Sequence, residues 1–228
     1  MKKLLSILMI SAVALSAKAQ TTYVQGGLNL ANITKTNDGQ TEDNNILPTF
    51  NVGLMHRFGF SPVVALETGL LFTGKGSKAE TYFTANGDNY VKSKFNPLYL
   101  EVPVNVVFKI PVGAGSNVFF HGGPYVAVGV AGKSISETKV GALVTRSEDN
   151  IKFSNDDPFT SHQEDAAYDK LKRFDFGLNF GGGFSFKHFI LKANYGLGLA
   201  KINSTQSDNT VNDKNKFRTM SFSVGIPF

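Results

Sequence analysis

The sequence predicts an all-β fold: a single eight-stranded, antiparallel, up-and-down transmembrane β-barrel with short periplasmic turns and long extracellular loops. Three observations lead to this prediction. Eight segments alternate apolar and polar residues with the two-residue period of a strand. Their polar rows consist mainly of Gly, Asn and Ser rather than of charged residues. The connections between them are alternately long and short, which is the pattern of outer-membrane barrels.

The eight predicted strands are, in chain order, 22–32, 49–59, 63–73, 96–109, 117–131, 172–187, 189–201 and 217–228. The clearest alternation runs over 174–186, where five Phe and one Leu on one face alternate with Gly, Asn, Asp and Ser on the other. Segments 22–32 and 117–131 alternate less regularly, which predicts β-bulges there.

The connections predict how the barrel is oriented. The long, polar ones follow the first, third, fifth and seventh strands, at 33–48, 74–95, 132–171 and 202–216. The short ones lie at 60–62, 110–116 and 187–188. Long loops are expected outside the cell and short turns in the periplasm, and an even number of strands places both ends of the barrel in the periplasm.

The chain begins with a predicted secretory signal peptide, residues 1–19, so the barrel domain is expected to be residues 20–228. Two Lys precede an apolar, uncharged run over 4–17, which is shorter than the ~20 residues of a membrane-spanning helix. The small side chains of Ala17 and Ala19 mark the expected cleavage site, which lies directly before Gln20.

Charge and cysteine content exclude several classes of function. The leader holds three of the 23 Lys and Arg, so 20 remain against 18 Asp and Glu, a net charge of +2. We therefore expect no nucleic-acid partner. The chain has no Cys, which excludes disulfides, thiolate metal sites and a thiol nucleophile.

The predicted strand YLEVPVNVVFK at 99–109 has an apolar row and a polar row of side chains, and either row could face the inside of the protein. In a soluble sandwich or lipocalin-like barrel, the apolar row would face a core and the polar row would face water. Polar rows facing water should carry many charges, and one small core has no room for Phe on strand after strand. We therefore favour apolar rows in lipid and small polar residues in a narrow lumen that side chains fill.

Six charged residues have the parity of the lumen: Arg57, Glu67, Glu101, Lys109, Asp175 and Lys192. A Lys or Arg on the lipid face near the midplane would cost roughly 2–4 kcal/mol. Arg57 and Glu67 lie on strands joined by a short turn and are expected to be diagonal neighbours. The sequence predicts a lumenal ion-pair network of Arg57, Glu67, Glu101 and Lys192, which either plugs the lumen or gates a path for ions or small solutes.

Three stretches and the C-terminus carry a family resemblance: AKAQ at 17–20, VQGGLNLAN at 24–32, YLEVPVNVVFK at 99–109 and the terminal SFSVGIPF. On these residues the chain resembles the PorT-like, porin-family eight-stranded outer-membrane barrels. The resemblance implies localisation in the cell outer membrane and no defined activity. It also implies an insertion signal for the barrel-assembly machinery, formed by Phe222, Val224, Ile226 and Phe228.

Patterns for catalysis or cofactors are weak. GLLFTGKG at 69–76 nearly matches a P-loop, but Gly76 replaces the Ser or Thr that would hold Mg²⁺, and the stretch lies on a strand. No strand rim is expected to pair a nucleophile with any of the four His, His56, His121, His162 and His188, so we expect no enzyme. The acidic loop 147–170 fits no recognised cation-binding loop, and we expect no metal and no cofactor. TANGDNY at 84–90 predicts a hairpin turn.

Three functions stay open from the sequence. The first is a structural or surface-interaction role, with the 132–171 loop as a docking site for an unidentified protein. The second is a narrow channel gated by lumenal charges, and the third is an accessory part of a secretion or assembly complex. The expected partners are outer-membrane lipid, lipopolysaccharide and, during biogenesis, the barrel-assembly machinery, and a monomer is expected.

Overall fold

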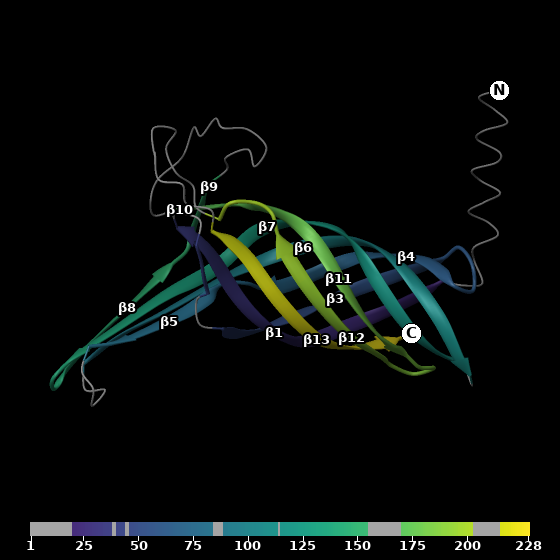
Figure 1. Ribbon diagram of the computed structural model, residues 1–228, viewed down its shortest axis with the longest axis horizontal. Helices are drawn as coiled ribbons and strands as arrows, with labels where there is room; N and C mark the ends of the chain where they lie inside the picture. The colour runs from purple at the N-terminus through teal and green to yellow at the C-terminus, as the bar shows by residue number, and fades with distance from the viewer. Residues whose placement is uncertain are drawn as a thin grey trace, which may run out of the picture.

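The computed structural model describes residues 20–37, 40–43, 46–83, 89–113, 115–154, 170–202 and 215–228. Eight of the strands formed by these residues make up a barrel (Figure 1). They are β1 Thr21–Asn37, β3 Leu47–Gly59, β4 Val64–Gly74, β6 Tyr90–Gly113, β7 Ser116–Val140, β11 Phe174–Ser185, β12 Ile190–Gly198 and β13 Lys216–Pro227. No helix in the described part of the chain is long and apolar enough to span a membrane.

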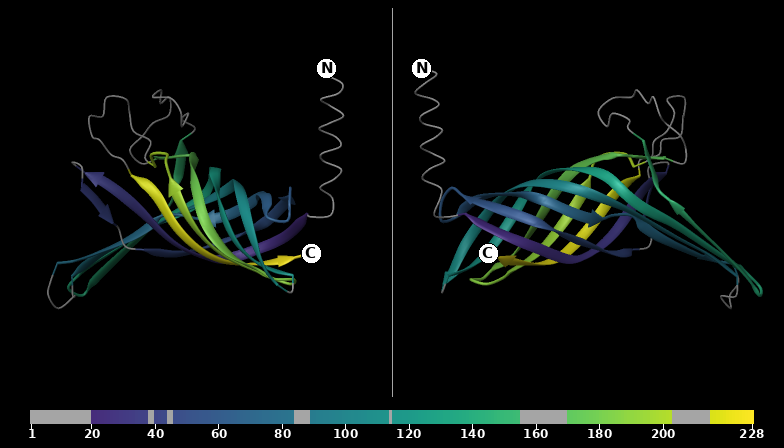
Figure 2. Two further views of the ribbon diagram at one scale, coloured as in Figure 1. Left: turned by 45° about the vertical axis from the view of Figure 1, so that its right-hand side comes forward. Right: turned by 180° about the vertical axis from the view of Figure 1, so that it is seen from behind.

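The barrel is a closed ring of antiparallel strand pairs. Consecutive strands of the eight pair with each other, and β1 closes the ring by pairing with β13, with Tyr23 opposite Pro227 and Thr34 opposite Lys216. Closure leaves the barrel wall without an unpaired edge. The strands of the wall are tilted relative to the barrel axis, which Figure 2 shows from two further sides. The predicted eight-stranded up-and-down fold is confirmed, and each predicted segment overlaps one of these strands.

Alternation along each strand separates an apolar outer surface from a polar interior. On β6, Val102 and Val104 are 37% and 41% exposed, whereas Glu101 and Asn105 on either side of them are buried. The residues of the expected insertion signal also lie on the outer surface, with exposed fractions from 46% to 78%: Phe222, Val224, Ile226 and Phe228. An outward apolar band around a polar interior is the distribution expected of a barrel in lipid.

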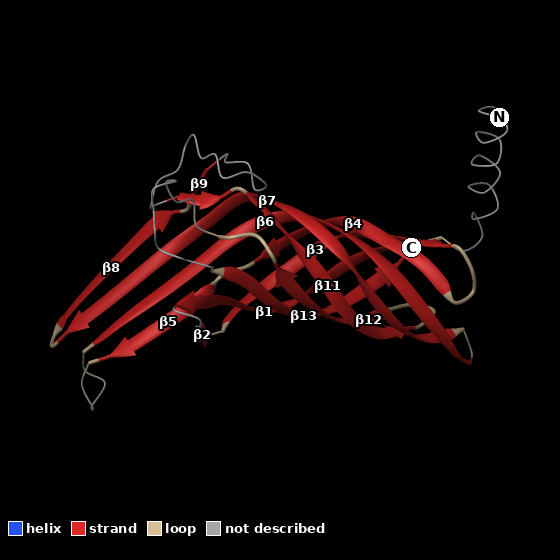
Figure 3. Cartoon of the chain, turned by 45° about the horizontal axis from the view of Figure 1, so that its top comes forward, coloured by secondary structure: helices blue, strands red, loops and turns tan. Residues whose placement is uncertain are grey.

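Two strand pairs continue beyond the barrel and form what we call the outer sheet. It consists of β5 (Ser77–Tyr82), the first part of β6, the last part of β7 and β8 (Leu143–Asn150), paired in that order. The sheet projects from one end of the barrel, at the left in Figure 3. The expectation of loops over 74–95 and 132–171 is therefore wrong for much of these ranges. Both faces of a sheet in water can be polar, so no apolar row marks its strands in the sequence.

Smaller features complete the fold. β2 (Gln40–Asp43) pairs with the end of β1, and β9 (Lys152–Ser154) pairs in parallel with β10 (Lys170–Lys172). On β7, Gly129 and Ala131 lie opposite the consecutive β6 residues Tyr99 and Leu98, so the register shifts there. This shift lies within 117–131, one of the two segments where a bulge is expected. The pairing of β1 with β3 and β13 runs without a shift. The predicted signal peptide (residues 1–19), most of the predicted 84–90 turn and residues 155–169 of the acidic loop lie outside the described residues.

Candidate functional site in the lumen

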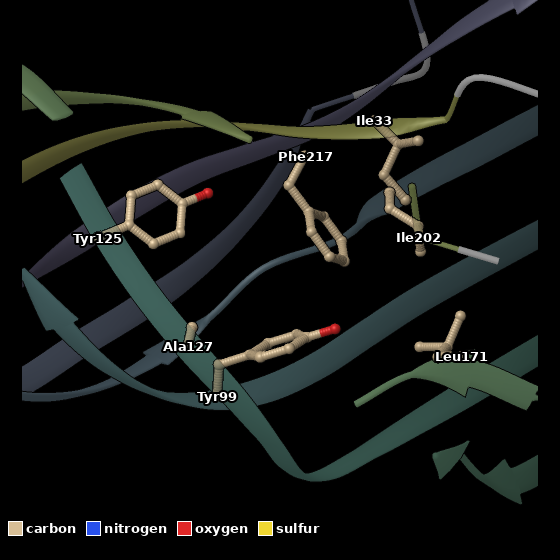
Figure 4. Packing of buried hydrophobic residues seen from close by; sticks show 7 residues of the cluster. All are labelled: Ile33, Tyr99, Tyr125, Ala127, Leu171, Ile202 and Phe217. Atoms are coloured by element: carbon tan, nitrogen blue, oxygen red, sulfur yellow. The ribbon is translucent and has the colours of Figure 1, made fainter. Parts of the chain in front are cut away.

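Two clusters of buried apolar residues lie in the interior of the barrel. The outer apolar cluster lies toward the outer sheet and contains Ile33, Tyr99, Tyr125, Ala127, Leu171, Ile202 and Phe217, each 7% exposed or less (Figure 4). Its rings meet edge-on, with the centroids of Tyr99 and Phe217 5.6 Å apart. The inner apolar cluster lies toward the short turns and contains Tyr23, Met55, Ala65, Val107, Phe119 and Ile190, each 1% exposed or less. The polar side chains of the lumen lie between these two clusters.

The inner charge cluster joins Arg57, Glu67 and Lys192. Arg57 Nη2 lies 2.6 Å from Glu67 Oε2, and Lys192 on β12 pairs with Oε1 of the same carboxylate from across the lumen. The Tyr23 hydroxyl donates a further hydrogen bond to Glu67 at 2.8 Å. Arg57 and Glu67 face each other directly in the register of β3 and β4, so the expectation of diagonal neighbours is wrong. One carboxylate between two cations gives this cluster a net charge of +1.

The outer charge cluster joins Lys75, Glu101 and Asp175. Lys75 Nζ lies 2.9 Å from Glu101 Oε2 and 2.7 Å from Asp175 Oδ2. The ammonium also lies 4.1 Å from the centroid of the Tyr125 ring, and the Tyr125 hydroxyl donates to Asp175 at 3.1 Å. With two carboxylates and one cation, this cluster has a net charge of −1. The structure thus divides the expected network into two clusters, and Glu101 pairs with Lys75 rather than with Arg57 or Lys192.

Lys75 is the functional residue that the sequence analysis missed. It lies between Gly74 and Gly76, and this Gly-Lys-Gly pattern is typical of a loop. Together with the residues before it, the pattern also resembles an imperfect P-loop. In the structure it follows Thr73 with the same inward parity, and its backbone N–H donates to the Pro97 carbonyl at 2.9 Å. Gly76 then turns the chain with a φ of 117°, which favours glycine. Extending the inward parity of β4 by two residues would have placed Lys75 in the lumen.

A layer of amides separates the two charge clusters. Asn51 donates to Asn29 at 2.7 Å, Asn29 donates to Thr73 at 2.8 Å, and Ser223 donates to Asn51 at 3.0 Å. A cavity of about 40 Å³ lies beside this layer, lined among others by Gln25, Lys75, Glu101, Asn105, Asn179 and Lys192. Since one water needs roughly 10–15 Å³, the cavity has room for about three.

Glycine in the polar rows makes room for the large rings of the lumen. A Cβ on Gly181 would lie 2.6 Å from His121 Nε2, and one on Gly177 would lie 2.7 Å from the Tyr125 ring. Each glycine faces the ring directly across the β7–β11 pair. The Gly-rich row of β11 therefore reflects close packing inside a narrow barrel.

Within the described ranges, no group of three or more His, Cys, Asp or Glu side chains could hold a metal ion. Thr22 Oγ1 lies 2.8 Å from His56 Nδ1, which corrects the expectation that no rim histidine lies beside a hydroxyl. No carboxylate of the described residues orients His56, and a hydroxyl with a base alone lacks the third group of a nucleophilic triad. His162 lies outside the described residues.

The chain belongs to the family of the outer membrane protein beta-barrel domain, whose model matches residues 19–204. It is therefore an outer-membrane β-barrel protein, as the closed ring and the outward apolar band indicate. The narrower, PorT-like assignment is left as a prediction. A comparison with curated proteins found no match in sequence.

Solved structures similar to this chain include three bacterial surface proteins. Ail, the attachment invasion locus protein of Yersinia pestis, has 14% identity and a TM-score of 0.39, with 91% of this chain and 98% of Ail covered. Neisserial surface protein A has 10% identity and a TM-score of 0.41, with 91% and 97% covered. OprG from Pseudomonas aeruginosa has 13% identity and a TM-score of 0.43, with 92% and 96% covered. These likenesses transfer no role to this chain.

Proposed function

We propose that this protein has a structural and surface-interaction role in the outer membrane, with a lumen that passes no solute and without catalysis. The observation that carries the proposal is the presence of a buried apolar cluster toward each end of the lumen. The cavity of about 40 Å³ between them holds a few waters but does not amount to a continuous aqueous path. A hydrated ion would have to displace the rings of Tyr99 and Phe217 at one end and of Phe119 at the other.

The charge clusters add cross-links through the same interior. Lys75 at the end of β4 holds Glu101 on β6 and Asp175 on β11, and Lys192 on β12 holds Glu67 on β4. Removing one partner from a buried ion pair costs about 3–5 kcal/mol. A gate that opened by separating these pairs would need a comparable input, which favours the plug over the gate.

The outer sheet supports the surface-interaction part of the proposal. From Asn96 back to Tyr90, β6 runs seven residues beyond the barrel wall, about 23 Å at 3.3 Å per residue. All eight residues of β8 are exposed. This sheet, rather than a loop over 132–171, is the element that we expect to meet a partner outside the cell.

The test is electrical conductance of the purified mature protein in planar bilayers. We expect no steady current from the wild type. The channel alternative predicts a reproducible current that Glu101→Gln alters, while the matched control Lys187→Gln in an exposed periplasmic turn leaves it unchanged. That result would overturn the sealed lumen. The accessory-component alternative predicts instead a complex of fixed stoichiometry after extraction in mild detergent.

A further inference from the structure

The outer sheet continues the lipid-facing surface of the barrel. On β6, the row that faces outward runs from Leu100 through Leu98 and Asn96 to Lys94 and Lys92. The alternate row faces inward, because Phe95 packs against the outer apolar cluster. The side of β6 that meets lipid lower down therefore becomes basic directly beyond the apolar band, and there it faces the surroundings of the barrel.

Strand pairing identifies the rest of this outward face. Lys78 lies opposite Lys94, Lys94 opposite Ile135, and Ile135 opposite Glu148. The same parity gives the outward face six basic and three acidic residues, a net charge of +3: Lys78, Lys92, Lys94, Lys133, Lys139 and Arg146 against Glu80, Glu137 and Glu148. The inward face carries Ser, Thr and apolar residues, and no Lys or Arg, over the same four strands. The excess of positive charge is thus confined to one face.

Lys78 and Lys94 are the two cations of this face that lie directly opposite each other, and neither is fully compensated. Lys133 pairs with Glu148 at 2.5 Å, and Lys92 lies 4.6 Å from the centroid of the Tyr90 ring. Lys94, however, forms no ion pair with any described residue, and its direct neighbour Lys78 reaches Glu80 only at 3.6 Å. Like charges directly opposite each other destabilise a sheet. An anion shared by the two ammonium groups would remove this repulsion.

The height of the pair above the apolar band indicates which anion it meets. Lys94 precedes Leu98 by four residues, about 13 Å along the strand, or about 10 Å along the membrane normal at the usual tilt of 35–45°. The headgroup zone of one leaflet is about 5–8 Å thick, and a lysine side chain reaches toward it. We propose that Lys78 and Lys94 bind the phosphate groups of an outer-leaflet glycolipid that stands beside the barrel.

Glycolipid binding at Lys78 and Lys94 does not depend on whether the lumen is sealed. It gives lipopolysaccharide, an expected partner, a defined site on the outward face of the outer sheet. The same chemistry could be offered by a soluble anionic polysaccharide. Continuity of the basic face with the lipid-facing row favours the membrane-bound source.

The test uses the folded mature chain in nanodiscs that contain either lipid A or enzymatically dephosphorylated lipid A, with bound glycolipid counted by native mass spectrometry. We expect Lys78→Gln/Lys94→Gln to weaken retention of lipid A about 30-fold, since each basic residue near an anionic surface contributes about fivefold. The matched control Lys109→Gln/Lys187→Gln, at the opposite end of the barrel, should retain it like the wild type. Lys78→Arg/Lys94→Arg keeps both charges and should also retain it.

Each other result contradicts the proposal. Equal retention of lipid A and its dephosphorylated form would exclude phosphate recognition, and equal retention by the Gln variant would exclude these lysines. Lysine-dependent binding of a soluble anionic polysaccharide, without retention of lipid A, would assign the face to a soluble partner. A shift in mobility on heating, measured for every variant, establishes that the barrels are folded.

Discussion

The substitution Lys75→Met tests whether the outer charge cluster holds the barrel together. Lys75 is the single cation of this cluster, and it contacts both Glu101 and Asp175 within 3 Å. Met keeps much of the length and apolar stem of the side chain but removes the ammonium. Two carboxylates, on residues that are 7% and 4% exposed, would then face each other without a cation.

The expected loss is about 3–5 kcal/mol of the free energy of unfolding, which is the usual effect of leaving a buried charge unpaired. This corresponds to a factor of roughly 10² to 10⁴ in the ratio of folded to unfolded protein. The triple variant Lys75→Met/Glu101→Gln/Asp175→Asn removes all three charges together. It should recover most of the loss, because no unpaired charge is then left in the lumen.

Urea titration of the barrel refolded into lipid vesicles measures both variants. Lys201→Met, an exposed lysine of the outer end, serves as the matched control and should change the stability by less than about 0.5 kcal/mol. A loss below about 1 kcal/mol for Lys75→Met would refute the reasoning, as would a triple variant that is less stable than the single one.

Three further predictions address packing and surface charge. Tyr99→Ala should lower the free energy of unfolding by about 3–5 kcal/mol, because it leaves a void in the outer apolar cluster; an unchanged urea midpoint would contradict this role. Gly181→Ala should destabilise by about 1–3 kcal/mol, since the new methyl group would collide with the Ala193 carbonyl oxygen and lie 2.6 Å from His121 Nε2, and an unshifted midpoint would contradict this close packing. The ammonium of Lys133 donates a hydrogen bond to Glu148 and lowers the pKa of that carboxyl, so Lys133→Met should raise it toward its ordinary value. The stabilisation from this pair is present above the ordinary carboxyl pKa and is lost as the pH falls, and an NMR titration that is the same in both proteins would argue against the pair.

The barrel could be predicted from the sequence because lipid imposes a strict pattern on its strands. When every second side chain over about ten residues is apolar, that row must face lipid. The alternate row, such as the one that contains Glu101, must then face the lumen. The outer sheet lies beyond the apolar band of the barrel, so its residues, among them Ser93 and Lys94, follow no apolar period. Lys75 was missed because its strand ends in a Gly-Lys-Gly turn.

The grouping of the charges could not be predicted for a different reason. Parity along a strand shows that Glu67 and Lys192 face the lumen, but it does not give their heights in a barrel with tilted strands. The register between strands decides these heights. It places Arg57 directly opposite Glu67 and brings Lys75 to Glu101 and Asp175, and register depends on the whole ring.

The long-range ion pairs of the lumen also bear on how the barrel is assembled. Lys75 and Asp175 lie 100 residues apart in the chain, and Lys192 and Glu67 lie 125 apart, on strands that are not neighbours in the wall. These bridges form only when nearly all strands have taken their places. A slip of one residue in any of these strands would turn its charge toward lipid, at a cost of roughly 2–4 kcal/mol for each Lys. The lumenal ion pairs therefore stabilise the barrel with the correct strand register and destabilise a barrel whose strands are misaligned.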